Sequence, residues 1–222
     1  MAFSDSATQT ITNDPLGYYN FAGTPAPSIL NLFPDFGTGS YTGQNQGPWS
    51  VAATDKYVVY GGEFPTVNGK AQYGLTRFAV SSIAPNKEGP IYSGALFKPT
   101  LVSLESGSVR VGWESNWDRD NANLSYAVYR DGNLTTPVYT TTSSSTFWKR
   151  PAVGFVDKGL APGSVHEYRV RATDPLGNTV LGDTVSVTVS ATAASPYQQQ
   201  VAKDGATALW RLGEKSGSTV YD

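Results

Sequence analysis

The amino-acid sequence predicts an all-β protein built around one antiparallel β-sandwich, with partial β modules on both sides of it. Short runs of alternating apolar and polar residues recur between residues 98 and 189, and Gly, Pro, Asn and Asp separate them. The 222-residue chain is also rich in Gly, Ser, Thr, Tyr and Trp and poor in Lys and Glu, as expected of strands and turns.

The predicted strands of the sandwich each place their apolar side chains on one face. In the run 108–113, Val109, Val111 and Trp113 share a face and Arg110 points the other way. The runs 124–130, 167–172 and 185–189 follow the same rule, with turn residues at Asp131-Gly132 and Gly177-Asn178. We therefore expect one dry interior between two facing sheets, formed by Trp113, Tyr126, Val170 and Val187.

Residues 96–190 resemble a fibronectin type III domain, which is an immunoglobulin-like β-sandwich. The resemblance rests on Trp113, on Tyr126 and on the corner Leu160-Ala161-Pro162-Gly163 before a long alternating strand. The family usually has a Tyr six residues after that Leu, and its hydroxyl bonds to the backbone of the corner. This chain has His166 there instead, and the resemblance implies a similar structural hydrogen bond.

The segments before the sandwich differ from each other in pattern. Residues 1–47 show little periodicity and are expected to be rich in loops, with at most one partial strand. Residues 48–95 predict a three-stranded meander, with strands at 49–53, 57–61 and 73–80 and a turn at Asn68-Gly69. The phrases Gly-Pro-Trp-Ser-Val and Tyr-Gly-Gly-Glu-Phe resemble one blade of a bacterial β-propeller, which implies that the meander is an incomplete module.

The segment after the sandwich begins with a linker, residues 191–196. A short helix is expected at 197–202, and the phrase Trp210-Arg211-Leu212-Gly213-Glu214 follows it. Residues 197–222 resemble the opening of a concanavalin-like, laminin-G-like jelly roll. Such domains are much longer, so the resemblance implies a truncated module.

Bulk composition excludes several classes of partner. Charged residues make up 15% of the chain and the net charge is −2, so there is no basic excess to bind nucleic acid. The apolar stretches are too short for a transmembrane helix, which argues against membrane insertion. The absence of Cys excludes a disulfide framework and most zinc sites.

We expect an extracellular protein, secreted or at the cell surface, because the module types are those of secreted bacterial polypeptides. Residues 1–5 contain neither the basic segment nor the apolar core of a signal peptide. A signal would then lie upstream of this sequence. Alternatively, Met1 is the true start and export follows another route, such as assembly into a phage particle.

The sequence predicts no enzyme, no catalytic residue and no cofactor. It contains one His, so a Ser-His-Asp triad would have to use His166, for which a structural hydrogen bond is the simpler role. No nucleophile elbow, zinc-protease motif or P-loop is present. Glycoside hydrolysis needs only two carboxylates across a cleft, but the acidic residues available are expected to be solvated in loops: Glu63, Glu105, Glu114, Asp118 and Asp120.

Two groups of residues are the best local candidates for a site. Asp118, Asp120 and Asn121 offer closely spaced oxygen ligands of the kind that calcium prefers, although an Asx-turn that rigidifies the loop 114–121 is the favoured interpretation. Trp117 and Trp148 are candidates for stacking on sugar rings, with the alternative that both cover the edge of the sandwich.

These features predict a non-catalytic spacer or binding segment of a secreted bacterial multidomain protein. Its expected partner is a carbohydrate or a cell-surface ligand, bound through neighbouring modules. Two alternatives stay open: an accessory region of an extracellular polysaccharide-degrading glycoside hydrolase, and a phage-tail or adhesin component. All three rest on analogy between folds.

Overall fold

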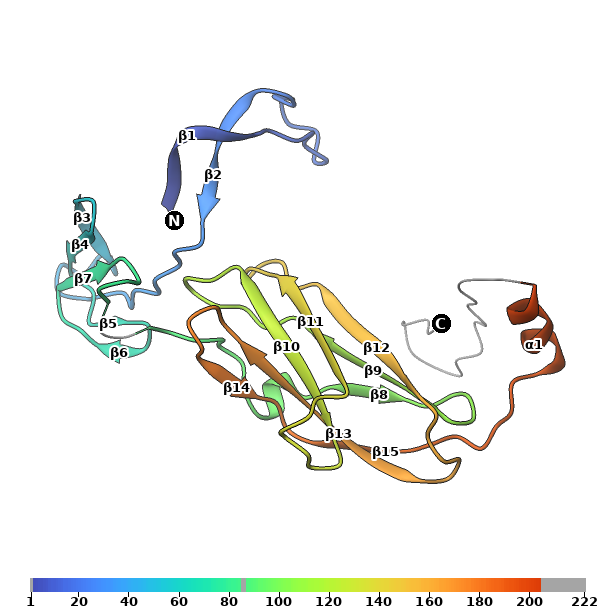
Figure 1. Ribbon diagram of the computed structural model, residues 1–222. Helices are drawn as coiled ribbons and strands as arrows, with labels where there is room; N and C mark the ends of the chain where they lie inside the picture. Colours follow the sequence, from blue (N-terminus) through green and yellow to red (C-terminus); the bar gives the residue numbers. More distant parts are fainter. Residues whose placement is uncertain (1, 85–86, 205–222) are drawn as a thin grey trace.

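A computed structural model describes residues 2–84 and 87–204, and it confirms an all-β sandwich as the centre of the molecule (Figure 1). One sheet has three strands in the order β12 (Ala152–Lys158), β9 (Ser108–Glu114) and β8 (Thr100–Val102). The facing sheet has five, namely β11 (Tyr139–Ser144), β10 (Asn123–Arg130), β13 (Val165–Thr173), β14 (Thr179–Leu181) and β15 (Val185–Thr188). All of these pairs are antiparallel.

The last edge of the five-stranded sheet is divided, because β14 and β15 pair with different halves of β13. Between them, Gly182 lies against the short 3₁₀ helix η1 (Ala95–Phe97). A Cβ at this glycine would lie 2.0 Å from the Phe97 carbonyl oxygen, so a larger residue would push the helix away. The absence of a side chain at Gly182 therefore lets the segment between β14 and β15 lie directly against η1.

The interior of the sandwich is the one that the sequence predicts. Trp113, Tyr126 and Val170 are all buried in a single apolar cluster, and half-buried Val187 packs against it. At one edge, the ring of Tyr139 on β11 stacks on that of Phe155 on β12, with centroids 4.4 Å apart, and so joins the two sheets. The predicted alternation is thus confirmed at its central positions.

The predicted meander is also confirmed. It is a sheet in the order β3 (Pro48–Ala53), β4 (Tyr57–Gly62), β7 (Leu75–Ala79). The hairpin β5 (Thr66–Val67) and β6 (Lys70–Ala71) lies between β4 and β7 in the chain, and its turn residues Asn68 and Gly69 both have positive φ. One face of the sheet carries an edge-to-face aromatic cluster of Phe36, Tyr60, Phe64 and Phe78.

The first 30 residues differ from expectation, because two strands form where at most one was predicted. Strand β1 (Ala2–Thr10) pairs with β2 (Pro25–Leu30) as an antiparallel hairpin that extends away from the sandwich (Figure 1). Most of its residues are exposed, so neither face needs to be apolar. A strand that is solvated on both faces leaves no alternation in the sequence, which is why it was missed.

At the other end of the described chain, the helix α1 (Pro196–Lys203) confirms the short helix expected at 197–202. Its Gln198 side chain donates a hydrogen bond to Glu105, in the loop between β8 and β9. The jelly-roll resemblance from Trp210 onward lies outside the described residues. No helix within the described ranges is long and apolar enough to cross a membrane.

Candidate functional site

A segment between β2 and the meander docks on the end of the sandwich. The Phe33 ring is buried against Phe147 and Trp148, at centroid distances of 5.5 and 5.3 Å. Its backbone N–H donates to the Arg119 carbonyl at 2.9 Å, and the Arg119 guanidinium donates back to the Phe33 carbonyl at 3.5 Å. We call residues 31–33, 114–121 and 145–148 the junction, since these three segments hold the meander against the sandwich.

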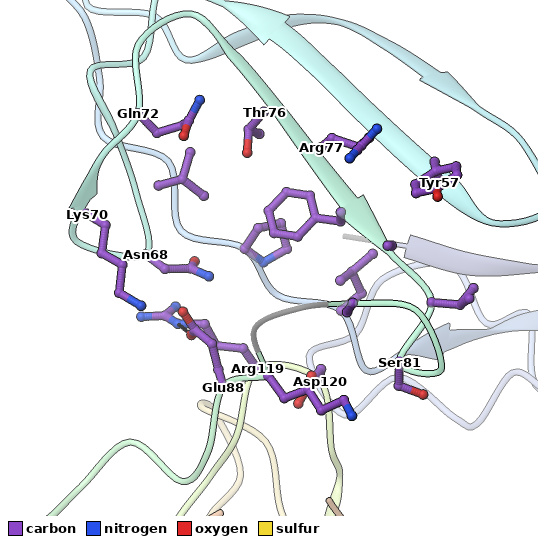
Figure 2. A pocket seen from close by; sticks show the side chains of 18 of the residues that line it. Tyr57, Asn68, Lys70, Gln72, Thr76, Arg77, Ser81, Glu88, Arg119 and Asp120 are labelled. Atoms are coloured by element: carbon purple, nitrogen blue, oxygen red, sulfur yellow. Dashed lines mark ion pairs between the residues drawn. The ribbon is translucent and has the colours of Figure 1, made fainter.

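Next to the junction, the meander and the sandwich enclose a cleft of about 720 Å³ (Figure 2). The meander contributes both faces of its free edge strand β7 and the hairpin β5–β6. The sandwich contributes Arg119, Asp120 and Asn121 from the loop after β9. Apolar side chains, among them Phe78 and Val80, line the wall between the polar groups. A concave site with an apolar wall and convergent polar groups is the usual form of a ligand site.

The side chains that line the cleft carry more positive than negative charge. Among the described residues, four cationic and two acidic side chains line it, namely Lys70, Arg77, Lys87, Arg119, Glu88 and Asp120. Arg119 forms an ion pair with Glu88 at 3.1 Å. Arg77 lies over the ring of Tyr57 on the neighbouring strand, with its guanidinium carbon 4.8 Å from the centroid. The cleft is therefore net positive on a chain whose net charge is −2.

The loop after β9 contains the three calcium candidates, and its geometry shows the Asx-turn. The Asp118 carboxylate accepts a hydrogen bond from the backbone N–H of Asp120 at 3.0 Å. Asp118 is fully buried, whereas Asp120 is exposed and accepts from the Asn121 amide. Within the described ranges, no three acidic, His or Cys side chains are grouped for a metal ion, and calcium binding stays a prediction.

Burial is the main influence on the pKa of the Asp118 carboxyl. Its second carboxylate oxygen is buried without a hydrogen-bond partner among the described residues. Desolvation, with the nearby Asp120 carboxylate, raises the pKa of Asp118 from 3.8 to about 7. The loop thus contains a carboxyl group that is mostly neutral below about pH 7 in the folded protein.

The two candidate stacking residues lie at the junction. Trp117 is only 9% exposed, with Phe147 at 5.6 Å and the Arg119 guanidinium at 5.4 Å from its ring. This burial favours its alternative role, as cover for the edge of the sandwich. Trp148 is 51% exposed and packs edge-on against Phe33, so part of its ring stays open to solvent. Sugar stacking therefore stays a prediction, and Trp148 suits it better.

His166 lies at the opposite end of the sandwich, in a chain of hydrogen bonds with Ser164 and Asp131. Its Nε2 is 2.9 Å from the Ser164 hydroxyl, and its Nδ1 is 2.8 Å from the Asp131 carboxylate. These three residue types and contacts are those of a Ser-His-Asp triad. However, the single hydroxyl proton of Ser164 is directed to the Ala161 carbonyl at 2.6 Å, whereas a serine nucleophile gives it to the imidazole.

The corner bond implied by the family resemblance thus takes an indirect form, because His166 reaches the corner through Ser164. Partial burial raises the pKa of Asp131, but hydrogen bonds from the Glu167 N–H and His166 outweigh it and lower that pKa overall. Asp131 begins the predicted turn, with a φ of 54°. The network therefore ties the β10 turn to β13 and to the corner.

We predict that a fluorophosphonate probe does not label Ser164. The reason is that the hydroxyl proton is held by the Ala161 carbonyl, and Ser164 does not line the cleft at the junction. The measurement is mass spectrometry of the treated chain, with Ser164→Ala as the matched control. Covalent labelling that disappears in Ser164→Ala would contradict the structural role of the network.

Three of the carboxylates considered for glycoside hydrolysis have partners in different parts of the molecule. Glu63 accepts from the backbone N–H groups of Thr42 and Gln46, and so closes the loop before β3. Glu105 accepts from Gln198, and Glu114 forms an ion pair with Arg150 at 3.0 Å. Of the five candidates, Asp120 alone lines the cleft.

Sequence reasoning missed the cleft residues of the meander, above all Tyr57, Lys70 and Arg77. Their strands were predicted, but nothing in the sequence indicates that they face the loop after β9. The one available signal was the occurrence of Lys70 and Arg77 in a charge-poor chain.

No protein-family model and no curated protein matches this chain. Among solved structures, it is similar to the sixth fibronectin type III domain of human fibronectin type III domain containing protein 3. The identity is 16% and the TM-score 0.35, over 50% of this chain and 94% of that domain. The fold described above is an all-β sandwich.

Proposed function

We propose that this chain is a non-catalytic spacer and binding segment of a secreted bacterial multidomain protein that attaches to carbohydrate or to a cell surface. The observation that carries the proposal is the position of the two docked neighbours. The meander is held at the β9 end that contains Glu114, and α1 at the loop before Ser108 (Figure 1). The sandwich thus lies between the meander, which precedes it in the chain, and α1, which follows it.

A spacer requires that its neighbours do not swing freely, and the junction supplies the necessary contacts. The Phe33 ring is buried there, and two backbone hydrogen bonds tie the sandwich to preceding segments: Phe33 N–H to the Arg119 carbonyl at 2.9 Å, and Ile91 N–H to the Trp117 carbonyl at 3.0 Å. Hydrogen bonds between two backbone segments join the parts of the chain and do not recognise a ligand, which fits a connecting role.

The test of the spacer is amide hydrogen exchange on the full chain. We expect the residue-33 amide to be protected in the wild type and to exchange at least about tenfold faster in Phe33→Ala, since the variant removes the buried ring that closes the junction. The control is Phe3→Ala in the exposed hairpin, which should leave residue 33 unchanged. An unprotected residue-33 amide in the wild type would contradict the rigid spacer.

A further inference from the structure

We propose that the cleft between the meander and the sandwich is itself a binding site for an anionic oligosaccharide. The proposal rests on the proposed function, since that function supplies carbohydrate as the class of ligand. It goes further by placing the site within this chain and by giving the ligand a charge. The observations that carry it are the charges, the planar groups and the shape of the cleft.

The charges favour an acidic ligand. Arg119 is paired with Glu88, but Lys70, Arg77 and Lys87 have no ion-pair partner within residues 2–84 and 87–204. Lys70 and Arg77 are exposed, so a ligand can reach them without breaking an ion pair. Cationic side chains form charge-assisted hydrogen bonds with carboxylate and sulfate oxygens, and Arg does so with two parallel bonds.

The neutral groups favour a sugar as the carrier of that charge. The flat Tyr57 ring and the Arg77 guanidinium lie on neighbouring strands β4 and β7, and Figure 2 shows them together at one end of the cleft. The other meander side of the cleft presents the amides of Asn68 and Gln72 and the hydroxyl of Thr76. Arg77 covers one face of the Tyr57 ring, and this aromatic ring beside amides and hydroxyls matches the apolar face and the hydroxyls of a pyranose ring.

The size and setting of the cleft fit a short oligosaccharide better than nucleic acid. Its volume of about 720 Å³ is within the range of sites for small ligands. A nucleic-acid surface needs a longer basic stripe that neutralises several successive phosphates, whereas here two acidic side chains interrupt the four cations. The cleft also lies where two modules meet, which is a common place for a ligand site.

The experiment measures binding of the full 222-residue chain to a glycan array that holds uronate-bearing and sulfated oligosaccharides beside neutral ones of matched backbone. We expect acidic members to bind and their neutral counterparts to bind at least about tenfold more weakly. Binding of an acidic hit, remeasured by calorimetry, should weaken as salt rises, because exposed charges are screened.

Variants then locate the site. Lys70→Ala and Arg77→Ala should each weaken binding of the acidic hit roughly 10- to 100-fold, the usual effect of losing a charged hydrogen bond. Lys158→Ala is the matched control, since this exposed lysine lies at the far end of β12, opposite Ser108. Circular dichroism confirms that each variant is folded.

The remaining outcomes separate the two proposals. Binding of neutral glycans alone, or acidic binding that both cleft variants leave intact, overturns the anionic cleft but keeps carbohydrate attachment. Binding of a DNA oligonucleotide that exceeds binding of every glycan also overturns the cleft proposal. An array with no bound glycan overturns the cleft, while the hydrogen-exchange test of the junction still decides the spacer.

Discussion

Asp118→Asn is expected to stabilise the protein at pH 8 by about 4 kcal/mol and to leave its stability near pH 4 unchanged. Burial raises the pKa of Asp118 from 3.8 to about 7, and this difference corresponds to about 4 kcal/mol. An amide at this position still offers an oxygen to the Asp120 N–H, so the Asx-turn is kept. The variant therefore removes the charge and places an amide nitrogen where the second carboxylate oxygen was.

The direction follows from proton linkage. Because the folded pKa lies above the unfolded one, the folded protein binds more protons between pH 4 and pH 7, and its stability falls as pH rises through that window. Above pH 7 the loss is complete and constant. Other carboxyls titrate as well, so the quantity to follow is the difference in unfolding free energy between Asp118→Asn and the wild type.

Urea unfolding at each pH between 4 and 8 gives that difference. The control is Asp55→Asn in the turn between β3 and β4, where the substitution should change the unfolding free energy little because the side chain is exposed. A constant loss of stability in Asp118→Asn at every pH would show that the buried carboxyl does not titrate as we describe.

Trp113→Ala is expected to lower the unfolding free energy of the chain by about 3–5 kcal/mol, because it leaves a large cavity in the interior of the sandwich. Trp113 is 4% exposed and lies between Tyr126 and Tyr139, at centroid distances of 5.8 and 6.5 Å. Denaturant unfolding followed by near-ultraviolet circular dichroism measures the loss.

The matched control for this variant is Trp49→Ala in the meander. Trp49 is 56% exposed on β3, so the same substitution should cost less than about 1 kcal/mol there. A cost below about 1 kcal/mol for Trp113→Ala would place this side chain outside the core and would undermine the two-layer fold. Since the buried residues of the sandwich's apolar cluster all fall between 97 and 189, we also expect residues 96–190 to fold alone and melt cooperatively.

The sandwich could be predicted from the sequence because its strands have one buried and one solvated face. Val109, Val111 and Trp113 are buried at every second position of β9, and that alternation can be read directly. The hairpin β1–β2 could not be predicted in this way, since most of its side chains on both faces are exposed. The meander could be predicted from its turn residues, of which Asn68-Gly69 are the clearest.

The cleft and the junction could not be predicted, because both depend on residues that the fold brings together from distant segments. Phe147 packs against Trp117, and Phe33 packs against Phe147 in turn. Both residues are distant from Trp117 in the sequence, so the sequence around Trp117 does not indicate these contacts. Likewise, Asp118 and Asp120 were indistinguishable as candidate ligands. The structure separates them, with Asp118 buried in the turn and Asp120 exposed at the cleft.

The most direct test of the account is nitrogen-15 relaxation measured on the full chain, because the spacer and the cleft both require that the meander and the sandwich move as one body. We predict the same rotational correlation time for backbone amides of β4 and of β10. A clearly shorter time for β4 would mean that the meander turns independently, and no fixed cleft would then exist between the two.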